Sequence, residues 1–195
     1  MLKLGVFVDV QNLQETFERQ GFEVRYDALK NNILRLFNLE EKDAKFIAFV
    51  PYRRDEDRRI RLIDALAFMG FRVVSKTIRE HPDGGLKASM DVELVLEAVN
   101  LYPELQEVVL VSGDSDFVAL VDFLSKRGRR VTIVGPGRVS TSVELIRMAD
   151  NYYNLEDFQG VLIPRTPREP ELLEPQEGPP PEFLRERTET DLDEV

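Results

Sequence analysis

Short apolar runs alternate with stretches of helical periodicity along most of the chain. Five runs have the length and composition of buried strands, and they lie at residues 4–9, 45–52, 71–75, 107–112 and 130–134. The spacing of apolar residues predicts a first helix that contains Leu13 and Phe17, and further helices at 26–37, 56–69, 90–101, 117–127 and 143–148. A last extended piece is expected near residues 152–155. This alternation predicts an α/β fold in which helices cover both faces of a mostly parallel central sheet.

The composition changes near residue 160. Residues 160–195 contain seven of the eleven prolines, and their ten acidic residues outnumber four arginines, so the segment has a net charge of −6. Such a segment cannot bury enough apolar surface to offset the entropy lost on ordering it. We therefore expect a folded domain over residues 1–159 and a disordered, acidic, proline-rich tail over residues 160–195. The tail is interpreted either as a solubilising segment or as an arm that binds a protein partner.

Charge and residue usage exclude several classes of protein. The chain has 195 residues, a formal net charge of −10, no cysteine and one histidine. The acidic balance argues against binding of nucleic acid through bulk charge, but it is compatible with an enzyme that binds nucleic acid locally. The absence of cysteine excludes disulfides, zinc–thiolate sites and thiol nucleophiles. No apolar run approaches the ~18 residues of a membrane span, so we expect a cytoplasmic protein without a membrane segment.

Four aspartates occupy positions that a parallel sheet would bring together. Asp9 ends the first predicted strand, Asp114 and Asp116 follow the strand at 107–112, and Asp91 opens the helix before that strand. Functional groups of open parallel sheets gather beyond the carboxyl ends of the strands. Carboxylates in one cleft repel each other unless a cation lies among them, and oxygen ligands favour Mg²⁺ or Mn²⁺. For each aspartate taken alone, the alternative is a helix N-cap.

Three segments together resemble an NYN domain, a branch of the PIN-like nuclease superfamily that occurs in bacterial proteins and in eukaryotic RNA-regulating proteins. The segments are FVDVQNL at residues 7–13, KASMDV at 87–92 and LVSGDSDFVALVDFL at 110–124. The resemblance covers about residues 1–155 and implies a three-layer α/β/α fold. It also implies an enzyme, a metal-dependent (endo)ribonuclease that hydrolyses RNA phosphodiester bonds with a water activated by Mg²⁺ or Mn²⁺.

The resemblance also implies roles for individual residues. The positions that match the family's catalytic, metal-binding acids are Asp9, Asp91, Asp114 and Asp116. Asn12 and Ser112 match polar residues that orient the water or the phosphate. Lys87 stands four residues before Asp91, whereas family members often have lysine and glycine close to the corresponding aspartate.

An arginine-rich segment directly after the second predicted strand is the candidate RNA-binding surface. The expected substrate contacts are Arg53, Arg54 and Arg58, with Lys87 and Arg138 farther along the rim. Tyr52 precedes the arginines and provides a ring on which an unpaired base can stack. Acidic residues interleave with the arginines at positions 55–57, so the alternative is a solvated helix face.

These observations lead to three hypotheses about function. The first is a metal-dependent ribonuclease that acts on single-stranded or flexible RNA. The second is an RNA-binding or regulatory adaptor, in which the nuclease site is weak or silent and the tail recruits a protein partner. The third is a phosphatase or nucleotide hydrolase, because carboxylate–metal sites on such sheets serve several phosphoryl chemistries. A homodimer is also considered, because symmetric pairing is common among small domains.

Overall fold

Six strands form the central sheet of the computed structural model, which describes residues 2–78 and 89–165. The strand order is β4-β3-β1-β5-β6-β7, and every neighbouring pair is parallel. The strands are β1 (Leu2–Asp9), β3 (Ala44–Tyr52), β4 (Arg72–Thr77), β5 (Leu105–Val111), β6 (Arg130–Gly135) and β7 (Asn151–Asn154). The predicted α/β fold with a mostly parallel sheet is confirmed.

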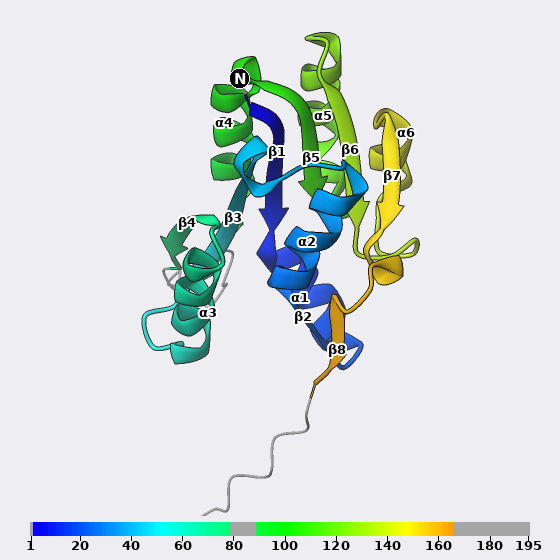
Figure 1. The fold of residues 1–195 in the computed structure, drawn as a ribbon. Helices are drawn as coiled ribbons and strands as arrows, with labels where there is room; N and C mark the ends of the chain where they lie inside the picture. The colour runs from blue at the N-terminus through cyan, green and yellow to red at the C-terminus, as the bar shows by residue number, and fades with distance from the viewer. Residues whose placement is uncertain (1, 79–88, 166–195) are drawn as a thin grey trace, which may run out of the picture. The chain divides into compact units, whose positions relative to one another are not determined.

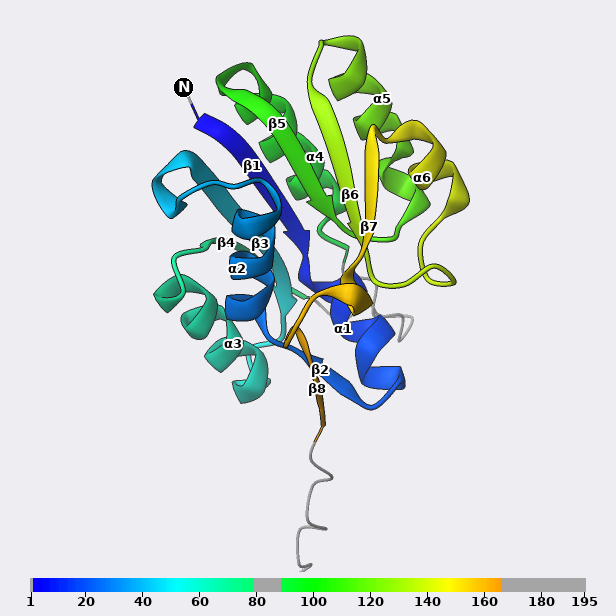
Figure 2. The same ribbon diagram turned by 45° about the vertical axis from the view of Figure 1, so that its right-hand side comes forward.

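Helices cover both faces of this sheet, as Figures 1 and 2 show. One face carries α1 (Val10–Arg19), α2 (Tyr26–Leu36) and α3 (Asp57–Phe68), and the other carries α4 (Asp91–Leu101), α5 (Val118–Lys126) and α6 (Val143–Met148). Single 3₁₀ turns are η1 (Glu41–Asp43), η2 (Tyr102–Glu104), η3 (Ser115–Phe117) and η4 (Leu155–Asp157). The architecture is therefore the three-layer α/β/α arrangement. Within the described ranges, no helix is both long enough and apolar enough to span a membrane.

The sheet separates two apolar cores. On the side of α1, α2 and α3, Leu13 and Phe17 are fully buried in a cluster with Val6 of β1. On the opposite side, Phe7 of β1 packs in a cluster with Phe117 and other side chains of α4, α5 and α6. Because successive side chains of a strand point to opposite faces, β1 needs apolar residues at nearly every position. This double burial explains why the strands read as continuous apolar runs.

The strand order reverses between β1 and β5. From β1 the chain proceeds to β3 and β4 on one side, and then returns to form β5, β6 and β7 on the other side. In the register of the central pair, Phe7 lies opposite Leu110 and Val8 lies opposite Val111. Asp9, the last residue of β1, and Ser112, directly after β5, are therefore neighbours at the carboxyl edge of the sheet. A crevice at such a reversal is the usual ligand site of open parallel sheets.

A second, two-stranded sheet joins distant parts of the chain. The strand β2 (Phe22–Val24) pairs antiparallel with β8 (Leu162–Pro164), and these two short strands were absent from the sequence-based prediction. Val161, just before β8, is completely buried. Residues 160–165, which the composition placed with the tail, thus belong to the compact unit that ends at Arg165. The rest of the predicted tail lies outside the described residues, as does Lys87.

Further backbone hydrogen bonds and ion pairs attach β8 to the domain. The backbone N–H of Arg25 donates to the carbonyl of Val161 (2.7 Å), and the N–H of Arg165 donates to the carbonyl of Gly21 (2.8 Å). The Arg165 guanidinium also lies 3.6 Å from Glu18 and 3.9 Å from Glu23. The last described residues are therefore fixed by backbone bonds, ion pairs and an apolar anchor.

We expect a chain that ends at Gly160 to be less stable than a chain that ends at Arg165. Loss of the buried Val161 side chain alone costs about 1.5–3 kcal/mol of the free energy of unfolding, and the β2–β8 hydrogen bonds are lost with it. The Tm of the shorter chain should be lower by at least roughly 5 °C in thermal denaturation followed by circular dichroism. Equal Tm values for the two chains would contradict the structural role assigned to β8.

Candidate metal centre

Three carboxylates meet at the carboxyl edge of the sheet. Asp114 and Asp116 lie in the turn that follows β5, and Asp91 is the first residue of α4. One oxygen atom of each side chain lies within 4.8 Å of an oxygen of both others. Asp91 and Asp114 are half-buried, and Asp116 is exposed. The structure thus brings together three of the four aspartates that the sequence analysis singled out.

Asp9, the fourth aspartate, is not part of this group, and hydrogen bonds within the protein hold its side chain. It is buried, with 7% of its surface exposed, and it caps the N-terminus of α1 because its Oδ1 accepts a hydrogen bond from the backbone N–H of Asn12 (3.1 Å). Its Oδ2 accepts a second hydrogen bond from the Ser112 hydroxyl (3.1 Å). Asp9 therefore does act as a helix N-cap, the alternative role considered from the sequence, but the cap uses only one of its two carboxylate oxygens.

The surroundings of Asp9 disfavour its charged form. Burial raises the pKa of Asp9 from 3.8 to about 6, although the hydrogen bonds from Asn12 and Ser112 act in the opposite direction. The negative charges of Asp91 and Asp114 are smaller contributions to this raised value. Asp9 is therefore close enough to the cluster to sense its charge. Four acidic side chains thus gather at this edge of the sheet, and repulsion between their charged forms must be balanced.

Hydrogen bonds join the ends of β1 and β5 into one rigid unit. The Asn12 side chain accepts a hydrogen bond through Oδ1 from the backbone N–H of Gly113 (3.0 Å). The Ser112 hydroxyl, which donates to Asp9, also accepts from the N–H of Asp114 (3.2 Å). Asp114 Oδ1 accepts from the N–H of Asp116 (3.0 Å) and so fixes the turn η3. Asn12 and Ser112 therefore position the backbone that carries Asp114 and Asp116.

The loop between β6 and α6, in which the sequence analysis placed only Arg138 near the site, packs against this unit. The N–H of Ser142, at the end of the β6–α6 loop, donates to the carbonyl of Gly113 (2.9 Å). A side chain at position 113 would collide with the backbone oxygen of Ser140, so only glycine fits there. The Gly-Pro-Gly turn at 135–137 marks this loop in the sequence, but the pattern does not reveal what the loop contacts.

The oxygen donors of the cluster suit a hard divalent cation. Among the described residues, no Lys or Arg forms an ion pair within 4.0 Å of the four aspartates Asp9, Asp91, Asp114 and Asp116. By contrast, Glu93 and Glu97 of the same helix α4 form ion pairs with Lys76 and Arg72 of β4, respectively. Carboxylate oxygens are the ligands that Mg²⁺ and Mn²⁺ take in proteins. A bound cation would also remove the repulsion between the carboxylates.

The arginines expected to contact substrate differ in their surroundings. Arg58, in the first turn of α3, is bound by Glu23 (2.5 Å) and Glu18 (3.7 Å). Arg53, directly after β3, forms an ion pair with Asp55 (3.0 Å), and Arg54 beside it is exposed. The acidic residues that interleave with this segment thus neutralise part of its charge. Only Arg53 and Arg54 lie directly at the carboxyl end of a central strand.

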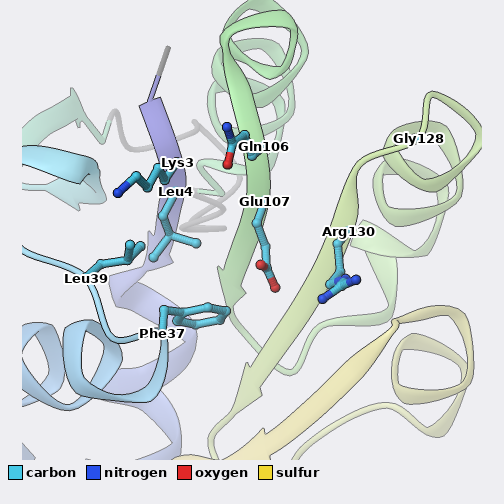
Figure 3. Close-up of a pocket in the computed structure, with 8 residues that line it drawn as sticks. All are labelled: Lys3, Leu4, Phe37, Leu39, Gln106, Glu107, Gly128 and Arg130. Atoms are coloured by element: carbon cyan, nitrogen blue, oxygen red, sulfur yellow. The ribbon is translucent and has the colours of Figure 1, made fainter.

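A cavity of about 420 Å³ lies at the opposite, amino edge of the sheet (Figure 3). It is lined by Lys3, Leu4, Phe37, Leu39, Gln106, Glu107, Gly128 and Arg130. Burial raises the pKa of Glu107 there, despite the charge of Arg130 and a hydrogen bond from Thr132. This cavity shares no residue with the acid cluster, so it is separate from the candidate metal centre.

Comparisons with known proteins agree with this geometry. The low amplitude and bright protein LabA of Synechococcus elongatus is 25% identical over 166 residues, which cover 82% of this chain and 87% of that protein. A crystal structure of a protein of unknown function from Vibrio parahaemolyticus is similar with a TM-score of 0.68 and 29% identity, over 83% of this chain and 96% of that one.

The NYN domain profile matches residues 3–156. This match extends from β1 to β7 and includes all three segments that carry the carboxylates. The chain therefore belongs to the NYN domain family, a branch of the PIN-like nuclease superfamily.

Proposed function

We propose that this protein is a metal-dependent ribonuclease in which Asp91, Asp114 and Asp116 hold Mg²⁺ or Mn²⁺. The observation that carries the proposal is the convergence of these three carboxylates within 4.8 Å at the reversal point of the sheet. Membership of the NYN family supports nuclease chemistry. The proposed substrate is RNA, which the cleavage assay described below tests directly.

The bound cation would activate a water molecule and neutralise charge on the scissile phosphate. The chain's own contribution is to present the carboxylates in a fixed arrangement. Ser112 and Asn12 do this through the backbone, because they hold the N–H groups of Asp114 and Gly113. Such preorganisation means that the ligands need no rearrangement when substrate arrives.

Asp9 has a supporting role in this proposal. Each carboxylate oxygen has more than one lone pair, so Asp9 can keep its hydrogen bonds to Asn12 and Ser112 and still face the cation. Its pKa of about 6 means that it carries its negative charge at neutral pH and loses that charge in mild acid. Asp9 thus adds a charge that attracts the cation and that depends on pH in the physiological range.

For the substrate we propose contacts from the end of β3. Arg53 and Arg54 follow the strand at the same edge as the carboxylates, and Tyr52 precedes them. Arginine binds phosphate oxygens in a planar, two-point arrangement. Arg58 contributes less in this scheme, because Glu18 and Glu23 already bind its guanidinium.

Replacement of Asp114 by Asn should abolish cleavage and leave the fold intact. The Asn side chain keeps the Oδ1 that accepts the N–H of Asp116, but it lacks the negative charge that a cation needs. We expect cleavage of a labelled, unstructured RNA in Mn²⁺ to fall at least about 100-fold, and EDTA to abolish cleavage by the parent protein. The matched control is Asp64→Asn on the exposed side of α3, which should cleave like the parent.

The outcome also separates the adaptor hypothesis from the nuclease hypothesis. Cleavage by the Asp114→Asn protein at the parental rate would overturn the proposed site. If neither protein cleaves RNA but both bind it equally with and without metal, the adaptor is the better description. Hydrolysis of small phosphate esters in place of RNA would point to the phosphatase class.

Mn²⁺ should raise the Tm of the parent protein at pH 8. A cation bound at 100 times its Kd adds about 2.7 kcal/mol to the free energy of unfolding, which corresponds to a rise of roughly 5–10 °C for a chain of this size. The Asp116→Asn protein should gain much less, whereas Asp64→Asn should behave like the parent. Differential scanning calorimetry provides the measurement, and equal shifts in all three proteins would show that Mn²⁺ binds elsewhere.

In the metal-free protein, protonation of Asp9 should contribute stability at low pH that is lost as pH rises. The folded state binds this proton more tightly than the unfolded state, so the stabilisation is complete below the unfolded pKa of 3.8 and is lost as pH passes about 6. The total loss is about 3 kcal/mol, of which roughly 1.5 kcal/mol falls between pH 5 and pH 8.

Asp9→Asn tests this assignment. In EDTA, the Tm of the variant relative to the parent should increase by about 3–6 °C between pH 5 and pH 8. Glu107, whose pKa is also raised, is present in both proteins and cancels from the comparison. Parallel curves of Tm against pH for the two proteins would show that Asp9 titrates with an ordinary pKa.

A further inference from the structure

The loop between β6 and α6, residues 136–142, presents an unusual pair of side chains to solvent. Val139 is fully exposed, at 101% of its reference surface, and Arg138 before it is also exposed. An isolated exposed valine is common on protein surfaces. Here, however, an apolar side chain and a cation stand together on a loop that packs against the backbone of the acid cluster.

The base of the loop is firmly anchored. Thr141 is 4% exposed, and its hydroxyl donates to the carbonyl of Gly137 (2.7 Å), which closes the loop on itself. Ser142 caps α6 by accepting the N–H of Leu145 and donates its own N–H to Gly113. Because these bonds fix the base of the loop, only its tip, Arg138 and Val139, is exposed for contact with a ligand. A ligand that meets this tip would not have to order the loop first.

The anchoring also fixes where the tip lies. Ser140 and Ser142 contact Gly113, the residue directly before Asp114. The loop follows β6, whose carboxyl end lies at the same edge of the sheet as that of β5. The tip therefore borders the acid cluster on the side of α6, opposite the segment after β3 that carries Arg53 and Arg54.

The charge of Arg138 is available on this side. In the described part of the chain, Arg138 has no carboxylate within 4.0 Å, whereas Arg58, Arg59 and Arg165 near α1 and α3 are bound by Glu18, Glu23 or Glu56. A polyanion near the cluster would be repelled by four aspartates and attracted by cations that are not already neutralised. Arg138 satisfies this condition beside the carboxylates themselves.

We propose that the β6–α6 loop is a substrate-binding element, in which Arg138 binds a backbone phosphate and Val139 packs against the ribose or base of the adjoining nucleotide. The proposal rests on the proposed ribonuclease function and names a specificity-determining contact for it. The phosphate contact would be independent of sequence, whereas the apolar contact would favour particular nucleotides next to the cut. The RNA strand would then cross the acid cluster between this loop and the segment after β3.

The test compares two arginine variants of the full chain. Arg138→Gln should weaken binding of a single-stranded RNA by about 3- to 10-fold and reduce the dependence of log K on log salt by roughly 0.7, the loss of one phosphate contact. Arg35→Gln is the matched control, because Arg35 is exposed in the last turn of α2 near the amino-edge cavity. It removes the same charge and should leave affinity, salt dependence and cleavage unchanged.

Binding is measured by fluorescence anisotropy in Ca²⁺, and cleavage in Mn²⁺ with the same RNA. In the cleavage assay, Arg138→Gln should raise KM and leave kcat within about twofold, because a ground-state contact is lost. Val139→Ser should keep the parental salt dependence and change the distribution of cut sites in a mixed-sequence RNA. These results together would support the loop as a substrate-binding element.

The failures of this inference and of the proposed function are distinguishable. If the parent cleaves RNA and the Arg138→Gln protein matches both the parent and Arg35→Gln in affinity and salt dependence, the loop is not a substrate contact and the nuclease assignment stands. An equal loss in both arginine variants would show that only net charge matters and would also overturn the inference. If the parent neither binds nor cleaves RNA, the inference and the proposed function fail together.

Discussion

Repulsion between carboxylates is the interaction that the rest of this site must counteract. Two unit charges 4 Å apart repel by about 4 kcal/mol at an effective dielectric constant of 20, and Asp91, Asp114 and Asp116 lie within 4.8 Å of one another. The parallel pairing of β1 and β5 holds Asp114 and Asp116 in place. Apolar cores cover this pair of strands on both faces, and the Asp9–Ser112 and Asn12–Gly113 hydrogen bonds join the strand ends. The stability of the cores thus maintains an arrangement that is locally unfavourable, as is typical of functional sites.

Asp91 reaches the cluster by a different route, through the placement of a helix. Met90 and Leu94 are buried in the core between α4 and the sheet, and they fix the first turn of α4 against β1. The N–H of Asp91 bonds to Ser89, while its carboxylate remains on the open side. The partial positive charge at a helix N-terminus lowers the cost of holding an anion there. Apolar contacts behind Asp91 therefore determine its position, and the helix itself partly offsets the charge.

Physical reasons explain which features the sequence could predict. The central strands could be predicted because burial on both faces requires unbroken apolar runs. The ends of these runs give the ends of β1 and β5, so Asp9, Asp114 and Asp116 could be placed at one edge of the sheet. The strands β2 and β8 were missed because each has only three residues, half-buried in β2 and mostly exposed in β8, so that neither shows a clear periodicity. Ion pairs between residues distant in sequence could not be predicted either. Nothing in the segment around Arg58 indicates that its guanidinium binds Glu18 and Glu23. The loop at 136–142 shows its turn, whereas its contact with Gly113 exists only in the folded chain.

The net charge of −10 constrains how such a protein binds a polyanion. Long-range attraction is absent, because charges beyond a Debye length of about 8 Å are screened at physiological salt, and the summed charge has the wrong sign. Under the proposed function, binding would depend on a few basic side chains close to the scissile phosphate, on stacking, and on the divalent cation that the carboxylates would hold. Most described arginines around α1 and α3 already have acidic partners, which keeps that surface from attracting nucleic acid indiscriminately. In the proposed function, by contrast, a phosphate would bridge the metal ion and Arg138 and would meet positive charge only beside the carboxylates. Local placement of charge would then provide the selectivity that a high overall positive charge would remove.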